Sequence, residues 1–257
     1  MLADVRPDIL INAAAYTGVD KAESEPNVAF AVNRDGAGHV AAACQDVGVP
    51  LIHFSTDYVF DGSASCPFGE EDRIAPLGMY GQSKWEGEEA VRSCHREHVI
   101  VRTAWLYGHH GQNFVKTMLR LAQERQVLWV VDDQRGCPTW SRDLAKAPAT
   151  MCQRIMQGGN FEPWSTYHFC SAGQTTWYGF ARAIFEEALA FEPLKVREIV
   201  PIPTTAYSTP AQRPAYSVLD CAKIQSVFGI MSRPWRESLH DYMQEFYTCT
   251  PIPLATS

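Results

Sequence analysis

The segment from Leu51 to Lys84 decides the fold. It begins with LIHFSTDY (Leu51–Tyr58) and ends with YGQSK (Tyr80–Lys84). The apolar run Leu51–Phe54 is typical of a short buried strand. Tyr80 and Lys84 are four residues apart in a stretch without proline, so on a helix they lie on one face. A hydroxyl at a strand end, a phenol and an ammonium can together move a proton to or from a carbonyl oxygen.

The Tyr-x-x-x-Lys spacing alone is a weak signal. Because the chain contains ten tyrosines, one such pair can arise by chance, and its ordinary interpretation is a surface contact worth ~0.2–0.5 kcal/mol. The context favours the catalytic interpretation, since a strand that ends in Ser-Thr is followed by a loop and then by the helix that carries the pair.

The composition is that of an ordinary soluble globular protein. Apolar residues make up 46% of the 257 residues and charged residues 20%, and the formal net charge of -7 argues against general nucleic-acid binding. The eight cysteines are widely spaced, which predicts reduced thiols and neither disulfides nor zinc. No apolar run approaches the roughly 20 residues that cross a bilayer, and the N-terminus lacks a signal-peptide pattern. We expect a cytoplasmic protein with no membrane partner.

Strand and helix patterns alternate over residues 1–156. Continuous apolar runs predict strands, and the segments between them predict helices. The strands are expected at 8–15, 51–54, 99–103 and 127–131, and the helices at 26–47, 80–94, 113–125 and 142–156. This alternation predicts a parallel sheet with helices on both faces, with ligands at the carboxyl ends of its strands. The segments that follow the strands are then expected to line one edge, namely 12–17, 55–58, 103–107 and 132–139.

Residues 157–257 show a different pattern. A strand is predicted at 167–170 and amphipathic helices at 176–189 and 235–246, with a Pro- and Thr-rich stretch between them. We expect two domains, a nucleotide-binding domain of residues 1–156 and a smaller lobe of residues 157–257 that interdigitates with it. The neighbouring histidines 109 and 110 lack a third convergent ligand, so no metal site is expected.

Several segments match a known family in one order over nearly the whole chain. They are 6–26 (RPDILINAAAYTGVDKAESEP), 53–60 (HFSTDYVF), 80–84 (YGQSK), 102–107 (RTAWLY), 113–122 (NFVKTMLRLA), 133–139 (DQRGCPT), 175–177 (TTW), 209–214 (TPAQRP) and 217–220 (SVLD). Together they resemble the dTDP-4-dehydrorhamnose reductase family, called RmlD, of the extended short-chain dehydrogenase/reductases. The resemblance implies an α/β fold, a Rossmann-like doubly wound parallel sheet with a smaller C-terminal α+β substrate lobe.

The resemblance also implies NADPH-dependent reduction of the C4 ketone of dTDP-4-dehydro-L-rhamnose to dTDP-L-rhamnose, with NADH as the alternative cofactor. Tyr80 is then expected to protonate the C4 alkoxide. Lys84 is expected to favour the phenolate and to hydrogen-bond the nicotinamide ribose, and Thr56 to hydrogen-bond the ketone oxygen.

Further contacts follow from the same resemblance. The residues implied for the cofactor are Asn12, Ala14, Ala15, Thr17, Ser55, Tyr80 and Lys84. The residues implied for the nucleotide-sugar substrate are Val19, Thr56, Asp57, Tyr58, Trp105 and Arg213. Ordinary core packing stays open for Trp105, and a plain surface arginine stays open for Arg213, which the pattern places in the second lobe.

The family's opening strand, Gly-rich turn and helix bind the cofactor pyrophosphate, and they have no counterpart before Gly18, the first glycine of the chain. We therefore expect an N-terminally truncated sheet whose strand at 8–15 is an exposed apolar edge. We also expect weaker NADPH binding than in a full-length relative, and the activity of this chain alone stays open.

Two other functions stay open. One is a non-catalytic subunit similar to the regulatory beta subunit of methionine adenosyltransferase, which shares the fold and part of the motifs, and the other is an inactive fragment. A homodimer is an open alternative to a monomer.

Overall fold

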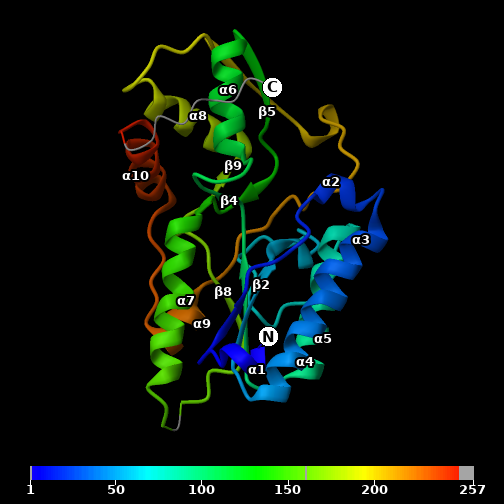
Figure 1. Ribbon diagram of the computed structural model, residues 1–257. Helices are drawn as coiled ribbons and strands as arrows, with labels where there is room; N and C mark the ends of the chain where they lie inside the picture. The colour runs from blue at the N-terminus through cyan, green and yellow to red at the C-terminus, as the bar shows by residue number, and fades with distance from the viewer. Residues whose placement is uncertain (1, 160, 249–257) are drawn as a thin grey trace. The chain divides into compact units, whose positions relative to one another are not determined.

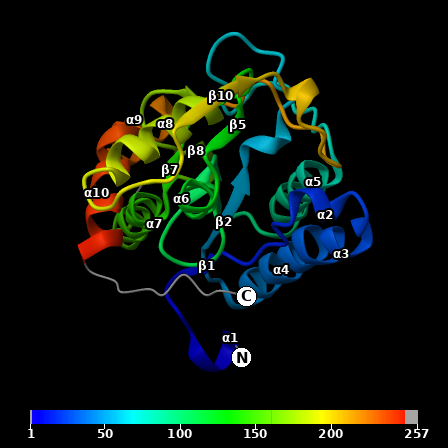
Figure 2. The same ribbon diagram turned by 90° about the horizontal axis from the view of Figure 1, so that it is seen from above.

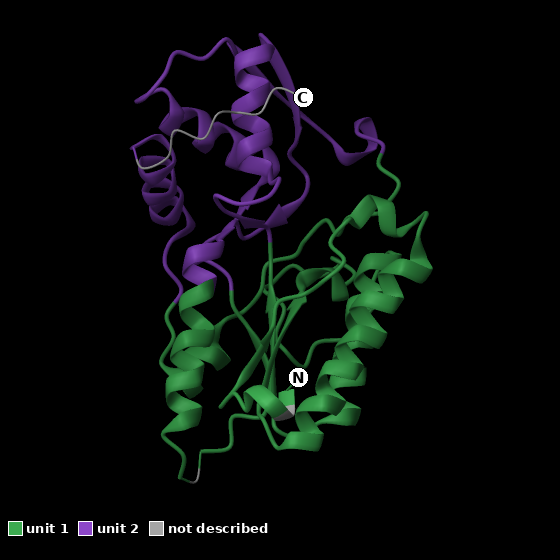
Figure 3. Ribbon diagram, viewed as in Figure 1, with its two compact units in different colours: residues 1–104, 145–169, 209–231 green, residues 105–144, 170–208, 232–257 purple. Residues whose placement is uncertain are grey.

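The computed structural model describes residues 2–159 and 161–248 (Figure 1). The chain forms two compact units, the first from residues 1–104, 145–169 and 209–231, the second from 105–144, 170–208 and 232–257 (Figure 3). Each unit therefore contains segments from both sides of residue 156. The boundaries of the two units differ from the expected division into residues 1–156 and 157–257. No helix in the described part of the chain is long and apolar enough to cross a membrane.

The first unit is built on a four-stranded sheet. Its strands follow the order β1 (Leu10–Asn12), β2 (Leu51–Thr56), β3 (His98–Thr103) and β8 (Ser165–His168). Every neighbouring pair is parallel, which confirms the predicted parallel α/β sheet. The strands β2 and β3 are almost wholly buried, as their continuous apolar patterns require.

Helices cover both faces of this sheet (Figures 1 and 2). One face carries α3 (Pro26–Phe30), α4 (Ala37–Val47) and α5 (Met79–Cys94). Two short helices, α1 (Leu2–Val5) and α2 (Val19–Ala22), precede α3 in the chain. The other face carries α9 (Ala222–Phe228) and the part of α7 (Ser141–Met156) that belongs to the first unit. A core of small and branched side chains fills the space between α4, α5 and the strands, namely Ala37, Ala41, Cys44, Leu51, Val91 and Ile100.

The predicted helix at 26–47 contains one irregular turn. A π-helical segment, Ala31–Gly36, joins α3 to α4, and such turns are often found at functional sites. The helix ends at Gly48, as predicted. Gly48 takes a left-handed conformation with φ of 66°, which glycine adopts without steric cost.

The strand β1 lies at one edge of the sheet, and within the described residues it pairs with β2 alone. Its Ile11 side chain is 45% exposed. Within the described residues, β1 is therefore an edge strand with a partly exposed apolar side chain.

The second unit has small sheets and a helical core. The paired strands are β5 (Val127–Val131) with β10 (Glu198–Ile202), β4 (Leu106–Tyr107) with β7 (Thr139–Trp140), and β6 (Arg135–Gly136) with β9 (Thr175–Thr176). The helices α6 (Phe114–Glu124), α8 (Trp177–Ala188) and α10 (Trp235–Thr248) supply most of its buried side chains.

The prediction that residues 127–131 continue the central sheet is wrong. This segment is a strand, β5, but it pairs with β10 in the second unit, and the fourth strand of the central sheet is β8. The segment 132–139 therefore does not belong to the edge of that sheet. An apolar run predicts that a strand is buried, but it does not specify its neighbour.

Candidate active site

The carboxyl end of β2 positions the first group of candidate residues. Thr56 is the last residue of the strand, and a single turn of 3-10 helix, Asp57–Val59, follows it. The Thr56 hydroxyl caps this turn by accepting a hydrogen bond from the Tyr58 amide at 3.2 Å. The same hydroxyl donates to Oδ1 of the buried Asp57 at 3.0 Å. The threonine side chain is thus held in one orientation.

Helix α5 brings the phenol and the ammonium to this strand. Gly81 allows the close approach, because a Cβ at that position would overlap the carbonyl oxygen of Tyr58. Thr56 acts on the Tyr80 phenol by lowering its pKa, and the Tyr80 ring meets that of Tyr58 edge to face with 5.4 Å between centroids. Lys84 is buried and donates from Nζ to the carbonyl oxygen of Phe54 at 2.6 Å. The structure therefore brings the three predicted reaction residues to one strand end.

The electrostatics of Tyr80 differ from the prediction. Burial raises the pKa of Tyr80 to about 12; the hydrogen bond with Thr56 works against this rise, and the charge of Asp57 adds to it. A lowered pKa through Lys84 was expected, but the lysine ammonium is bound to the backbone of β2. The phenol is therefore held in its protonated form at neutral pH.

The charge of Lys84 is also destabilised in this position. Burial lowers the pKa of Lys84 to about 8, and the negative charge of Glu88 opposes this effect. An ammonium with such a pKa can lose or gain a proton under mildly alkaline conditions.

A buried ion network lies one helical turn beyond Lys84. The Glu88 carboxylate is fully buried and accepts hydrogen bonds from Arg102 at 2.9 and 2.7 Å and from Arg92 at 2.7 Å. Burial alone would raise the pKa of Glu88, but the two guanidinium groups lower it. Sequence reasoning missed this network. Its signals are the four-residue spacing from Lys84 to Glu88 and a charged Arg102 within an apolar strand.

The loop after β1 is held by two asparagines. Asn12 ends the strand, hydrogen-bonds His53 Nδ1 at 3.1 Å and accepts from the Ala14 amide at 3.1 Å. Asn33, in the π-helical turn, accepts from the Tyr16 amide at 2.8 Å and donates to the Tyr16 carbonyl at 3.1 Å. Asn33 also donates to Oγ of Ser83, in α5, at 2.9 Å. This clamp, which sequence reasoning missed, fixes the loop to the helix of Tyr80.

The residues expected to contact a cofactor lie on this same edge. Ala14 and Thr17 are exposed, Ala15 is half-buried, and Asn12 and Ser55 are buried. The short, exposed side chains leave the backbone of the loop open to a ligand.

The structure places Arg213 differently from the prediction. Arg213 belongs to the first unit, not to the second lobe. Its guanidinium pairs with Asp20 at 2.8 Å, and Asp20 also accepts from the Ala211 amide at 3.2 Å. The Arg213 side chain is 23% exposed, and its ion pair fixes the segment to α2, next to the half-buried Val19.

Trp105 lies in the second unit, in a strained conformation. Its φ of 46° is unusual for a residue with a side chain. The indole stacks on Trp177 with 3.4 Å between centroids and an interplanar angle of 5°. Gly136 lies against the indole, and a Cβ at that position would overlap the ring. Strain of this kind persists only where surrounding contacts hold it, and it is frequent at ligand sites.

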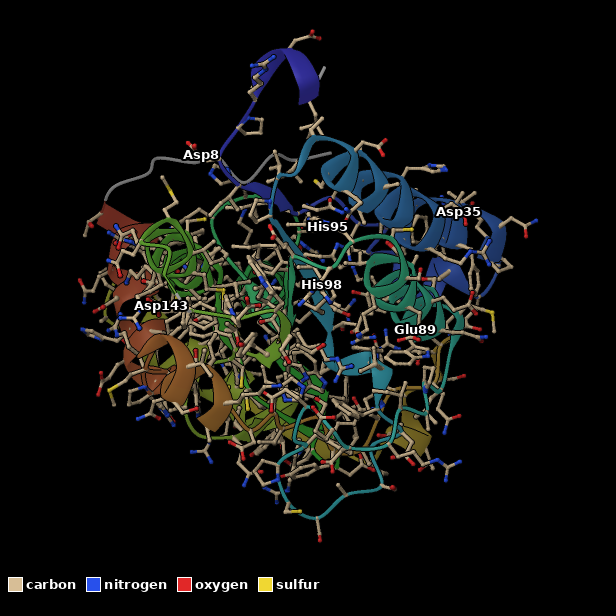
Figure 4. All side chains as sticks on the ribbon, turned by 90° about the horizontal axis from the view of Figure 1, so that it is seen from below. Asp8, Asp35, Glu89, His95, His98 and Asp143 are labelled. Carbon is tan, nitrogen blue, oxygen red and sulfur yellow. The ribbon has the colours of Figure 1, made fainter. Side chains whose placement is uncertain are left out.

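Titratable side chains at the opposite end of the first unit have structural partners. Figure 4 shows His95 and His98 near the beginning of β3. His95 bonds Gln45 at 2.8 Å and the Val49 carbonyl at 3.0 Å, and His98 bonds the His95 carbonyl. Among residues 2–159 and 161–248, no group of three or more His, Cys, Asp or Glu could hold a metal ion.

A parallel α/β sheet with a Thr, a Tyr-x-x-x-Lys pair and a loop of small residues at its carboxyl edge defines a protein of the short-chain dehydrogenase/reductase class. Residues 1–248 match the family described as RmlD substrate binding domain, and the chain belongs to this family.

Several similar proteins are named dTDP-4-dehydrorhamnose reductase. A dTDP-4-dehydrorhamnose reductase of Sinorhizobium fredii is 46% identical over 239 residues, which cover 92% of this chain and 80% of that protein. The crystal structure of a Bacillus anthracis dTDP-4-dehydrorhamnose reductase in complex with NADP is 39% identical, with a TM-score of 0.85. A Clostridium acetobutylicum reductase of the same name is 38% identical, with a TM-score of 0.87. Both alignments cover 95% of this chain and 83% of the solved chain.

Proposed function

We propose that the protein reduces the C4 ketone of dTDP-4-dehydro-L-rhamnose with NADPH, forming dTDP-L-rhamnose. The observation that carries the proposal is the meeting of Thr56, Tyr80 and Lys84 at the carboxyl end of β2. The identity of 46% with a reductase of this name supports the substrate. The relatives reported above do not support the alternative of a methionine adenosyltransferase subunit.

Tyr80 is the proton donor in this proposal. When bound, NADPH supplies the hydride that adds to C4 of the sugar. Tyr80 gives its proton to the oxygen of the former ketone, and solvent returns a proton to the phenol afterwards. Because the pKa of Tyr80 is raised to about 12, the phenol carries its proton at neutral pH, as an acid in the direction of reduction must.

Lys84 and the loop after β1 serve the cofactor. Ala14 and Thr17 are small and exposed, so a ligand can approach the loop backbone, which two hydrogen bonds fasten to Asn33. Lys84 contributes a hydrogen bond to the nicotinamide ribose and a positive charge behind the phenol. NADP in the Bacillus anthracis structure supports this cofactor, with NADH as the alternative.

The substrate is a nucleotide sugar. Its contacts in the first unit are Thr56, Asp57, Tyr58, Val19 and Arg213, and we infer a separate contribution from Trp105 in the second unit. The cofactor-binding role of the first unit, the substrate-binding role of the second, a homodimer and a cytoplasmic location stay predictions.

Ketone-dependent NADPH oxidation by the purified protein tests the proposal. We expect oxidation with dTDP-4-dehydro-L-rhamnose and a large loss of rate in Tyr80→Phe. The matched control is Tyr207→Phe, which removes the same hydroxyl from a tyrosine that is 58% exposed. A protein that oxidises NADPH equally with and without the keto sugar does not have this function.

A further inference from the structure

The Thr56 hydroxyl lies between two groups that compete for its bonds. A hydroxyl has one proton to donate and two lone pairs that accept. Its distance to Oδ1 of Asp57 is 3.0 Å, and it accepts from the Tyr58 amide at 3.2 Å. It also acts on the Tyr80 phenol, whose pKa it lowers.

The ionisation of Asp57 sets the direction of these bonds. An ionised carboxylate can only accept, so Thr56 must give it its single proton. Thr56 then has no proton to give to the Tyr80 phenol, which can interact with the hydroxyl only as a donor. In this state Thr56 has no proton left for a ketone oxygen, in contrast to the role expected from the sequence.

Asp57 is placed to change this direction. It is 2% exposed at the start of the 3-10 turn. Burial raises the pKa of Asp57 to about 6, and hydrogen bonds with Ser217 and Thr56 oppose the rise. Two titratable groups face Asp57, namely Tyr58 in the same turn and Tyr80 in α5. The charge of Asp57 raises the pKa of both tyrosines. Arg213 and Asp20, from the neighbouring segments, act on Tyr58.

We propose that Asp57 is a positioning residue that controls whether Thr56 can donate to the substrate. When Asp57 is ionised, Thr56 is turned towards it, and Tyr80 alone serves the ketone oxygen. When Asp57 is protonated, the Thr56 hydroxyl no longer has to donate to it. Thr56 and Tyr80 can then both donate to the substrate oxygen on which charge develops. Asp57 keeps its own proton throughout the turnover. The kinetic consequence of this inference rests on the proposed function. The coupling between Thr56 and Asp57 does not.

The coupling can be measured without turnover. Carbon-13 NMR of the carboxyl group reports the titration of Asp57, and the signal is assigned by its loss in Asp57→Asn. Because Thr56 stabilises the carboxylate, Thr56→Val is expected to raise the pKa of Asp57 by about one pH unit. Thr56→Ser, which keeps the hydroxyl, is the matched control and should leave the titration near that of the unchanged protein. An equal pKa in Thr56→Val and the unchanged protein overturns the proposal.

The kinetic consequence is tested by a double-mutant cycle. In the unchanged protein kcat should rise as the pH falls through about 6, and this step should be absent in both Thr56→Val and Asp57→Asn. In the Thr56→Val background, Asp57→Asn should change kcat by less than about twofold, because Asp57 acts through Thr56.

Two results contradict the positioning role. One is a step that persists in Asp57→Asn, and the other is an equal loss of kcat from Asp57→Asn with and without Thr56. If Asp57 only contacts the sugar, its replacement raises KM in both backgrounds. A protein without any ketone-dependent NADPH oxidation rejects the proposed function alone, since the NMR titration still decides whether Thr56 and Asp57 are coupled.

Discussion

Replacing Lys84 with methionine is expected to reduce the change in the free energy of unfolding between neutral and alkaline pH. The Lys84 side chain is 2% exposed, and its pKa is lowered from 10.5 to about 8. The unfolded chain therefore binds this proton more tightly than the folded protein does. The cost of burying the charge is fully present below pH 8 and disappears as the pH rises through 10.5.

The magnitude follows from the difference between the two pKa values. At 1.36 kcal/mol per pH unit, the buried charge costs about 3 kcal/mol at pH 7 and less than about 1 kcal/mol at pH 10. Methionine is similar in length and carries no charge. It also loses the hydrogen bond to Phe54, which costs about 1–3 kcal/mol at every pH. The pH-dependent part of the difference thus isolates the charge.

Urea unfolding at pH 7 and pH 10 measures this part. The free energy of unfolding of the unchanged protein should increase by about 2 kcal/mol relative to Lys84→Met between the two pH values. The matched control is Lys146→Met, which makes the same substitution at an exposed lysine. A difference for Lys84→Met that is the same at both pH values would refute the reasoning, since the ammonium would then be as well solvated as in the unfolded chain. NADPH oxidation should fall in Lys84→Met even where the fold is more stable.

The remaining predictions concern the supports of the site. Arg102→Met leaves Glu88 with Arg92 as its remaining guanidinium partner and should lower the free energy of unfolding by about 3–5 kcal/mol; a loss below about 1 kcal/mol in urea unfolding would show that the network is not buried in solution. Gly87→Ala should destabilise the protein by at least about 1 kcal/mol, since the added Cβ overlaps the carbonyl oxygen of Asn33. Gly69→Ala is its control, because Gly69 has no positive φ and the nearest atom to a Cβ there, Oδ2 of Asp72, lies at 3.9 Å. Trp177→Ala removes the ring stacked on Trp105, so KM for the sugar should rise more than kcat falls. An unchanged KM would separate Trp105 from substrate binding.

Much of the first unit could be predicted from local patterns. The strand at 51–54 and the helix at 80–94 are found as β2, Leu51–Thr56, and α5, Met79–Cys94. The strand is indicated by an unbroken apolar run, and the helix by a long segment without proline. Tertiary contacts do not change either local structure. Because β2 ends at Thr56 and Gly81 of α5 packs against Tyr58 in the turn that follows, the candidate residues of the two segments meet.

The partner of a strand and the charge state of a side chain could not be predicted in the same way. The run Val127–Val131 is as apolar as a central strand, yet it pairs with β10, because pairing depends on the whole topology. Lys84 has the spacing of a partner for Tyr80, yet its ammonium bonds the backbone of Phe54. The acid that acts on it, Glu88, is bound by two arginines. Such distances between side chains are set by packing and leave no periodic trace in the sequence.

The central claim is that Tyr80 protonates a sugar ketone as a hydride from NADPH reaches C4. The most direct test uses NADPH labelled with deuterium at the transferred position and analyses the sugar product by NMR. The proposal predicts dTDP-L-rhamnose with deuterium at C4, formed by Tyr80→Phe at a rate about 10²–10⁴-fold lower than by the unchanged protein. Oxidation of the cofactor without deuterium at C4, or an unchanged rate in Tyr80→Phe, would contradict it.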